Sequence, residues 1–408
     1  MAHFWQGLRS GEWLTRPRMR SYSLILLALY VIAAMVWIGL SDGLIDRNGK
    51  PIGTDFSDVY AAGRLVWQGH APDAYDPPLQ HAAEQAVFGR DVPFYGWHYP
   101  PFFLAIAFLV AALPYALGLG LWLLGSFAAY LAAIRAILPR PESWLIASAF
   151  PAVFINVGHG QNGFLTTALL GGALHWLRRR PWLAGVLIGL LAYKPQFGVL
   201  IPLALVAGGY WRTIGSAALT VAMLVVLSYL ILGSSIWHAF EASTTFTQTV
   251  VLEAGGTGWE KIQSIFSAVR MWGGSVPLAY SAQAAIAITL AATLAWLWHS
   301  DAAFELKAAA LAAASLLATP YVLDYDLVVA GLAIAYLARL GVARGFRSFE
   351  ISLLSAAWIV PLLSRGIAKT TGIPLGLLVL LLLYALILHH AIEDRKPGVL
   401  GAPSVAPA

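Results

Sequence analysis

The first apolar run of the chain decides its fold class. Residues Ser21–Leu40 read SYSLILLALYVIAAMVWIGL, without a charged side chain. About 20 mainly apolar residues are needed for a helix to cross the hydrocarbon core of a bilayer. A run of this length is predicted to stay in the membrane as a span and not to be cleaved as a signal peptide.

Composition extends this prediction to the whole chain. Of the 408 residues, 59% are hydrophobic and 11% are charged, against about 25% charged residues in soluble domains. The sequence therefore indicates a polytopic membrane protein, and its 16 Trp and 16 Tyr fit aromatic belts at the two interfaces. The absence of cysteine excludes disulfides, Cys-ligated metals and thiol catalysis.

Positive charge predicts the orientation in the membrane. Four arginines precede the first span, namely Arg9, Arg16, Arg18 and Arg20. Basic residues stay on the cytoplasmic side, so we expect a cytoplasmic segment 1–20 and an external loop 41–98. The transmembrane domain is predicted over 21–389, with a second external loop at 233–276 and a disordered cytoplasmic tail at 390–408. The net charge of +5 follows this topology and does not indicate nucleic-acid binding.

Several later apolar segments are too short for a full span. Leu183–Ala192 and Phe197–Gly209 belong to a group with about 10 to 14 residues each, whereas a span needs about 20. Short segments paired around a polar break indicate hairpins whose tips line a water-filled cavity. Phe102–Ile134 fits either one broken crossing or two. We predict an all-α bundle of 11 to 13 transmembrane helices.

The first external loop contains two carboxylates, Asp55 and Asp58, in the stretch GTDFSDVY at 53–60. The apolar residues around them predict one or two short amphipathic helices on the membrane surface. Asp55 or Ser57 can cap such a helix by accepting a free backbone N–H. Asp55 can equally serve as a general base, which must be a carboxylate or histidine close to the reacting hydroxyl.

Two further polar motifs flank apolar helices. In His98-Tyr99-Pro100-Pro101, an interfacial aromatic belt explains the tyrosine and prolines, and His98 is left as a possible phosphate or sugar contact. The group His159-Gly160-Gln161-Asn162 fits either a polar helix connection or a site for a hydroxyl-rich ligand.

Charged residues at membrane depth are costly and need a partner or a function. Lys194, in Lys194-Pro195-Gln196, can neutralise Asp324 or Asp326, bind a lipid phosphate, or do both. Arg365 is a further phosphate candidate, although it can also extend to the interface without binding a ligand.

No Walker loop, HExxH, GxSxG, dinucleotide fingerprint or Cys/His metal array occurs in the sequence. We therefore predict no metal and no cofactor. If the protein is an enzyme, its substrates are expected to come from the membrane.

The ordered set of motifs is similar to that of a known family. It comprises Asp55-Phe56, Tyr60-Ala61-Ala62-Gly63, Tyr75-Asp76, Tyr99-Pro100-Pro101, Gly160-Gln161-Asn162, Ala184–Gly189, Lys194-Pro195-Gln196, Pro320-Tyr321 and Tyr325-Asp326. From about Asp55 to Asp326 the chain resembles the family 87 membrane glycosyltransferases. This GT-C-type group includes polyprenol-phosphate-mannose-dependent mannosyltransferases.

The resemblance implies a GT-C fold and an inverting transfer from a polyprenyl-phosphate sugar on the external face. It assigns the catalytic base to Asp55. The chain departs from the family pattern at Asp58, where many relatives carry an apolar residue. This additional carboxylate makes Asp58 the alternative base. Lys194, His98 and Arg365 are the candidates for the donor phosphate. The candidate sugar- and acceptor-binding residues are Tyr60, Tyr99, His159, Gln161, Asn162, Gln196, Tyr321, Asp324, Tyr325 and Asp326.

The predicted function is transfer of mannose or another hexose to a lipid- or glycan-linked hydroxyl. A monomer in the bacterial inner membrane is expected, with a periplasmic active site and with membrane lipids as its surroundings. Two other functions stay open. A flippase for a lipid-linked sugar explains the broken helices equally well, although no inverted repeat is found. A non-catalytic scaffold explains the composition but not the clustered polar groups.

Overall fold

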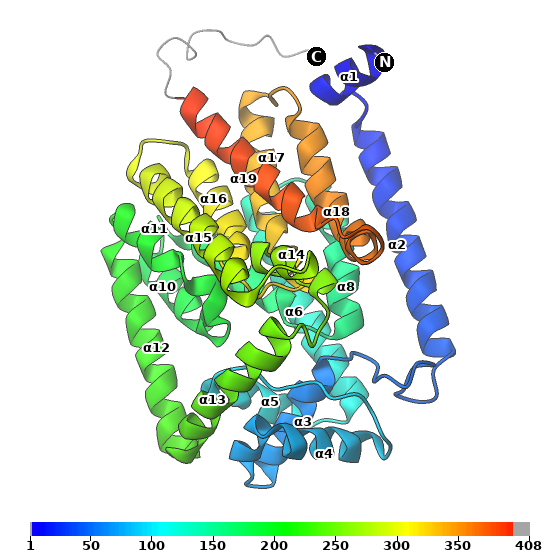
Figure 1. The fold of residues 1–408 in the computed structure, drawn as a ribbon. Coiled ribbons are helices and arrows are strands. Elements are labelled where there is room, and N and C mark those ends of the chain that lie inside the picture. The colour runs from blue at the N-terminus through cyan, green and yellow to red at the C-terminus, as the bar shows by residue number, and fades with distance from the viewer. Residues whose placement is uncertain (1, 395–408) are drawn as a thin grey trace.

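The computed structural model describes residues 2–394 as 19 α-helices joined by short turns (Figure 1). Among these residues no strand forms, and only three isolated β-bridges occur. The predicted all-α class is therefore confirmed. Both described chain ends lie at the end of the molecule opposite to α3 and α4 (Figure 1).

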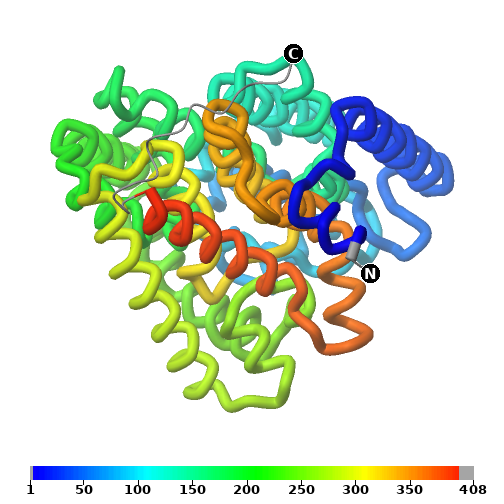
Figure 2. Tube along the Cα trace, turned by 90° about the horizontal axis from the view of Figure 1, so that it is seen from above, coloured from blue at the N-terminus to red at the C-terminus, as the bar shows by residue number. Residues whose placement is uncertain are grey.

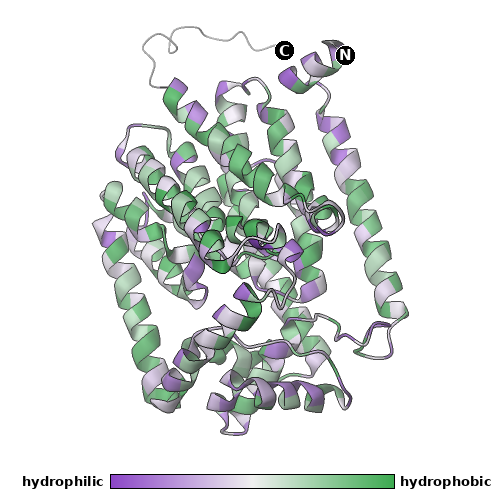
Figure 3. Cartoon of the chain, in the orientation of Figure 1, coloured by the Kyte–Doolittle hydropathy of each residue, from purple (hydrophilic) through white to green (hydrophobic). Residues whose placement is uncertain are grey.

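Seven helices in residues 2–394 are long and apolar enough to cross a membrane. They are α2 (Arg16–Gly39), α6 (Tyr115–Ile137), α12 (Trp211–Leu232), α15 (Val276–His299), α17 with its preceding turn (Asp324–Arg344), α18 (Glu350–Thr371) and α19 (Leu375–Glu393). Figure 3 shows apolar residues along these helices and more polar residues on α4 and the neighbouring loops.

The shorter helices lie between the long ones and at both ends of the bundle (Figure 1). They are α1 (Ala2–Ser10), α3 (Phe56–Trp67), α4 (Pro77–Phe88), α5 (Leu104–Ala111), α7 (Ser143–Ser148), α8 (Pro151–His159), α9 (Gly163–Trp176), α10 (Pro181–Leu190), α11 (Ile201–Ala207), α13 (Ser235–Phe246), α14 (Ile265–Met271) and α16 (Phe304–Leu317). Phe102–Ile134 forms two helices, because Pro114 interrupts the backbone between α5 and α6. The total of 11 to 13 spans stays a prediction.

Helix α16 forms the centre of the bundle. All residues from Ala308 to Leu317 are buried, and the helix packs against α15, α17 and α19. A helix that is buried on every side belongs to the interior of a bundle. Its many alanines allow the neighbouring backbones to approach closely.

Helix α3, in the predicted first external loop, is packed against other helices of the protein. Nine of its twelve residues are buried, and it packs against α4 and α5. Its small residues make this possible: a Cβ atom at Gly63 would lie 2.1 Å from the Ala107 carbonyl oxygen of α5. Helix α3 is therefore a packed part of the bundle and holds Asp55 on a rigid support.

The first and the last long helix, α2 and α19, contact the bundle to different extents. Helix α19 continues to Glu393, four residues into the predicted tail, and residues 395–408 of that tail lie outside the described residues. Helix α2 stands at the edge of the molecule, and Ser23 is its one buried residue (Figure 2). An apolar cavity of about 890 Å³ separates parts of α2 and α18.

Candidate active site

The Asp55 side chain is held by three neighbours. Gln161 Nε2 donates to its Oδ2 at 3.0 Å, and Thr54 Oγ1 donates to its Oδ1 at 3.0 Å. His159 Nδ1 lies 3.4 Å from the same Oδ1. Asp55 occupies the N-cap position of α3, but its carboxylate makes no capping bond. The alternative that this side chain is a helix cap is therefore wrong.

Backbone geometry brings Asp55 to His159. The Asp55 N–H donates to the His159 carbonyl at 2.9 Å, which joins the first external loop to the end of α8. Gly160 then turns the chain with a φ of +64°, and a Cβ atom there would lie 2.7 Å from Phe56 Cβ. Only glycine combines this conformation with this contact at low cost.

Gln161 links the carboxylate to the other predicted site residues. Its Nε2 also donates to the Tyr325 hydroxyl at 3.2 Å, and its Oε1 accepts from Tyr99 at 3.4 Å. Asn162 Nδ2 donates to the Tyr99 hydroxyl at 2.7 Å. The structure thus brings Asp55, Tyr99, Gln161, Asn162 and Tyr325 into one hydrogen-bonded group.

Two ion pairs flank this group. Lys194 Nζ lies 2.7 Å from Asp326 Oδ1, and the two side chains are only 6% and 3% exposed. Arg365 Nη1 lies 3.5 Å from Asp324 Oδ2, and its side chain is 40% exposed. Lys194 is therefore committed to a buried pair, whereas Arg365 keeps donors free for a ligand.

The pKa values of the two carboxylates of the first loop, Asp55 and Asp58, are shifted in opposite directions. Burial raises the pKa of Asp55, but the charge of His159 and hydrogen bonds from His159, Gln161 and Thr54 outweigh it and leave this pKa below its usual value. Burial raises the pKa of Asp58 well above its usual range, and the charge of Asp55 raises it further. One Asp58 oxygen has no hydrogen-bond partner among the described residues. The opposite shifts of the two pKa values favour Asp55 as the ionised carboxylate.

The remaining predicted residues lie around the group without a direct bond to Asp55. Burial lowers the pKa of His98 to about 4, so its imidazole is neutral, and it contacts Thr247 Oγ1 at 2.8 Å. The Tyr60 hydroxyl donates to the Leu113 carbonyl at 2.7 Å. Tyr321 and Gln196 are half-buried on neighbouring turns.

Sequence reasoning missed Lys261, which the second external loop brings to the site. Ile262 forms a β-bridge with Leu323, and the Gln263 N–H donates to the Val322 carbonyl at 2.7 Å. Burial lowers the pKa of Lys261, and the nearby charge of Arg365 lowers it further. No residue motif marks Lys261, because a loop-to-loop bridge positions it.

Glu84 is the second residue that was missed. Its side chain lies buried on α4 and accepts the Tyr95 N–H at 3.0 Å. Burial raises the pKa of Glu84 to about 8, so it is protonated at neutral pH. In the sequence, Pro77–Phe88 has the pattern of an ordinary surface helix, so its burial depends on tertiary packing.

We expect Glu84→Gln to stabilise the protein increasingly as the pH rises. The folded protein holds the Glu84 proton more tightly than the unfolded chain, so this contribution to stability is complete below about pH 4.5 and is lost as the pH rises through about 8. Glutamine has no proton to lose. Thermal unfolding of both proteins in detergent between pH 5 and pH 9 should show a difference in Tm that grows by on the order of a few degrees.

The matched control is Glu241→Gln, an exposed glutamate of α13. The difference in Tm between Glu241→Gln and the wild type should not change with pH. A constant difference for Glu84→Gln would contradict a buried, protonated Glu84.

The fold and this polar group define a polytopic, all-α membrane protein with a hydrogen-bonded, partly exposed carboxylate. Residues 97–320, more than half of the chain, match glycosyltransferase family 87, and the chain belongs to this family. No curated protein and no solved structure was found to match the chain. The matched range includes Tyr99, Gln161 and Lys194 but not Asp55.

Proposed function

We propose that this glycosyltransferase moves a hexose from a polyprenyl-phosphate donor to a hydroxyl of a lipid or glycan acceptor, with inversion at the anomeric carbon. The observation that carries the proposal is the Asp55 carboxylate, which is ionised, 18% exposed and oriented by Gln161 and Thr54. A base for glycosyl transfer needs these three properties: negative charge, access to the acceptor and fixed orientation.

In the proposed step Asp55 takes the proton of the acceptor hydroxyl. The acceptor oxygen forms a bond to C1 of the sugar while the bond from C1 to the phosphate oxygen breaks. Polyprenyl phosphate leaves with the electron pair of that bond, and C1 is inverted because attack and departure occur on opposite faces. We do not assign the base to Asp58, because it is buried and burial raises its pKa well above the usual range.

The leaving phosphate needs positive charge close to where its own charge develops. Arg365 is partly exposed and pairs only loosely with Asp324 at 3.5 Å. Lys261 lies close enough for its charge to act on Arg365. We therefore assign the donor phosphate to Arg365 and Lys261, in place of Lys194, which pairs with Asp326, and His98, which is neutral.

The site is proposed to face the external side of a bacterial inner membrane. Arg9 precedes α2, and Arg16, Arg18 and Arg20 lie at its N-terminal end, so the positive-inside rule keeps that end in the cytoplasm. The Asp55 loop follows the other end of α2. Membership in a glycosyltransferase family favours sugar transfer over transport, so the flippase alternative is not proposed further.

Donor binding provides the test. Wild-type protein in nanodiscs should bind a polyprenyl phosphate mannose, measured by native mass spectrometry. Arg365→Gln and Lys261→Gln should each weaken this binding by about tenfold, because each removes a charged hydrogen-bond donor from the phosphate. Transfer of radiolabelled mannose to octyl mannoside in the same nanodiscs should fall at least as much.

Arg90→Gln is the control, because Arg90 is an exposed cation outside the proposed phosphate site that pairs with Asp42 at 2.8 Å. It should bind the donor like the wild type. If wild-type protein binds the donor and moves it across the bilayer without forming a glycosidic bond to any acceptor offered, the proposal fails. Equal losses in all three variants would contradict the phosphate assignment.

A further inference from the structure

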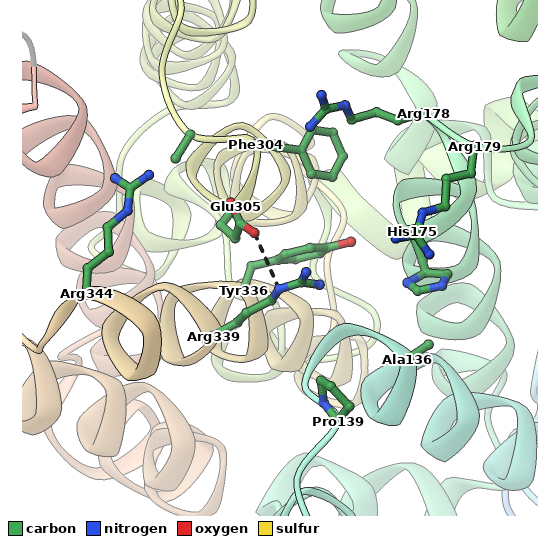
Figure 4. Close-up of a pocket in the computed structure, with 11 residues that line it drawn as sticks. Ala136, Pro139, His175, Arg178, Arg179, Phe304, Glu305, Tyr336, Arg339 and Arg344 are labelled. Carbon is green, nitrogen blue, oxygen red and sulfur yellow. Dashed lines mark ion pairs between the residues drawn. The ribbon is translucent and has the colours of Figure 1, made fainter.

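A polar cavity lies at the end of the bundle opposite to Asp55. It has a volume of about 820 Å³ and is formed where α6, α9, α16 and α17 end or begin (Figure 4). Helices α9 and α17 each start next to the Asp55 group and run to this cavity. With 14 and 15 residues, these helices separate the two sites by about 20 Å.

Four arginines line this arginine cavity: Arg178, Arg179, Arg339 and Arg344. Glu305 is the one acidic residue of the lining, so four positive charges minus one negative charge leave a net charge of +3. Glu305 is 3.4 Å from Arg339, and Arg344 pairs with Asp394 outside the lining at 3.3 Å.

Arg178 and Arg179 form no ion pair within residues 2–394. Arg178 instead lies over the ring of Phe304, 5.9 Å from its centre. After the pairs of Arg339 and Arg344, the charges of Arg178 and Arg179 are left without a counterion among the side chains that the structure describes. A small anion would supply one.

A buried hydroxyl also indicates that a ligand belongs in this cavity. Tyr336 is 2% exposed and lines the cavity, and its hydroxyl has no hydrogen-bond partner among the described residues. Figure 4 shows this hydroxyl directed to the side of the cavity where His175 and Arg179 lie. Nearly all buried polar groups have a partner, so an orphaned hydroxyl next to unpaired guanidinium groups points to an absent ligand.

Membrane topology alone does not explain this arrangement. Arginines at the cytoplasmic ends of spans orient the chain. That role needs charge near the ends of helices, as at Arg180, which stacks on Trp176 with 4.7 Å to the ring centre and lies outside the lining. It does not require four guanidinium groups around one concave space with a tyrosine hydroxyl inside it.

We propose that the arginine cavity binds a phosphate-bearing anion. Guanidinium groups match phosphate oxygens with pairs of parallel hydrogen bonds, and Tyr336 adds a neutral donor. Two sources have this chemistry: the head group of an anionic membrane lipid, since the cavity opens between helix ends, and a soluble phosphate compound. This site is separate from the proposed donor site and does not depend on the proposed reaction.

Two probes distinguish the sources. The first probe is phosphatidylglycerol. The full-length protein is purified from mixed phosphatidylcholine–phosphatidylglycerol vesicles, and native mass spectrometry measures how much phosphatidylglycerol it retains. Binding of inorganic pyrophosphate to the protein in phosphatidylcholine nanodiscs is measured by calorimetry. Binding of the lipid identifies a head-group site, and binding of pyrophosphate alone identifies a site for a soluble ligand.

The double variant Arg178→Gln/Arg179→Gln should weaken binding of the successful probe by about tenfold or more, because two charged donors are lost. Tyr336→Phe keeps the buried ring, and it should weaken binding by about threefold through the hydroxyl alone. Arg180 lies at the same end of the bundle but outside the cavity. Arg180→Gln also removes a guanidinium charge, and it should bind the probe like the wild type.

The proposal is overturned if the wild type binds neither probe. It is also overturned if Arg180→Gln weakens binding as much as the double variant does, since general surface charge would then explain the result. Thermal unfolding of each variant checks its fold, and Tyr336→Phe tests the site even if the double variant does not fold.

Discussion

Asp55→Asn is expected to reduce sugar transfer by about 10²- to 10⁴-fold, the range that positioned general bases contribute. Asparagine keeps the size of the side chain, and its carbonyl oxygen can still accept the Gln161 or Thr54 hydrogen bond. It carries no charge and cannot take the acceptor proton. Because the base is lost and the phosphate contacts are not, donor binding should stay within about twofold of the wild type.

Asp58→Asn is the matched control, since it makes the same change three residues away. Asp58 is buried away from the acceptor, and burial raises its pKa, so replacing its carboxyl group should leave transfer nearly unchanged. Rates in nanodiscs with a polyprenyl phosphate mannose donor measure both variants. Full activity of Asp55→Asn, or a larger loss in Asp58→Asn, would rule out Asp55 as base.

The second large effect is expected at the Lys194–Asp326 pair. Lys194→Met leaves the buried Asp326 carboxylate without its cation, and loss of one partner of a buried pair costs about 3 to 5 kcal/mol. Asp326→Asn should cost a similar amount, although its side-chain oxygen can still accept the Leu323 N–H. The double variant Lys194→Met/Asp326→Asn removes both charges and should recover most of the loss.

Thermal unfolding of the three variants in detergent measures this coupling. Arg90→Gln provides the comparison, because breaking its exposed pair with Asp42 should cost about 0 to 1 kcal/mol. If the double variant regains stability and still binds the donor, Lys194 is structural. Recovered stability with lost donor binding would instead return the phosphate role to Lys194.

The central part of the site could be predicted from sequence because its residues stand in short motifs. Asp55 and Gln161 were chosen as polar groups between apolar segments, and the structure joins them by a hydrogen bond. Lys194 was expected to meet Asp324 or Asp326, and it meets Asp326. A charged residue at membrane depth needs a partner, so few pairings were possible.

The rest of the site depends on packing that no local pattern shows. Glu84 has the sequence surroundings of a surface helix, and it is buried only because α4 packs against α3. Lys261 reaches the site through the bridge between Ile262 and Leu323. Helix α3 packs closely against α5 because Gly63 has no side chain, and no local pattern in the sequence shows this contact.

The Gln161 side chain has a consequence for biosynthesis. It bonds to Asp55 near the start of the chain and to Tyr325 near its end. A membrane protein is made and inserted from its N-terminus, so the nascent chain carries Asp55 long before Tyr325 leaves the ribosome. The complete site therefore forms only after the segment Asp324–Arg344 has been inserted, and truncated chains that end before it lack a finished catalytic centre.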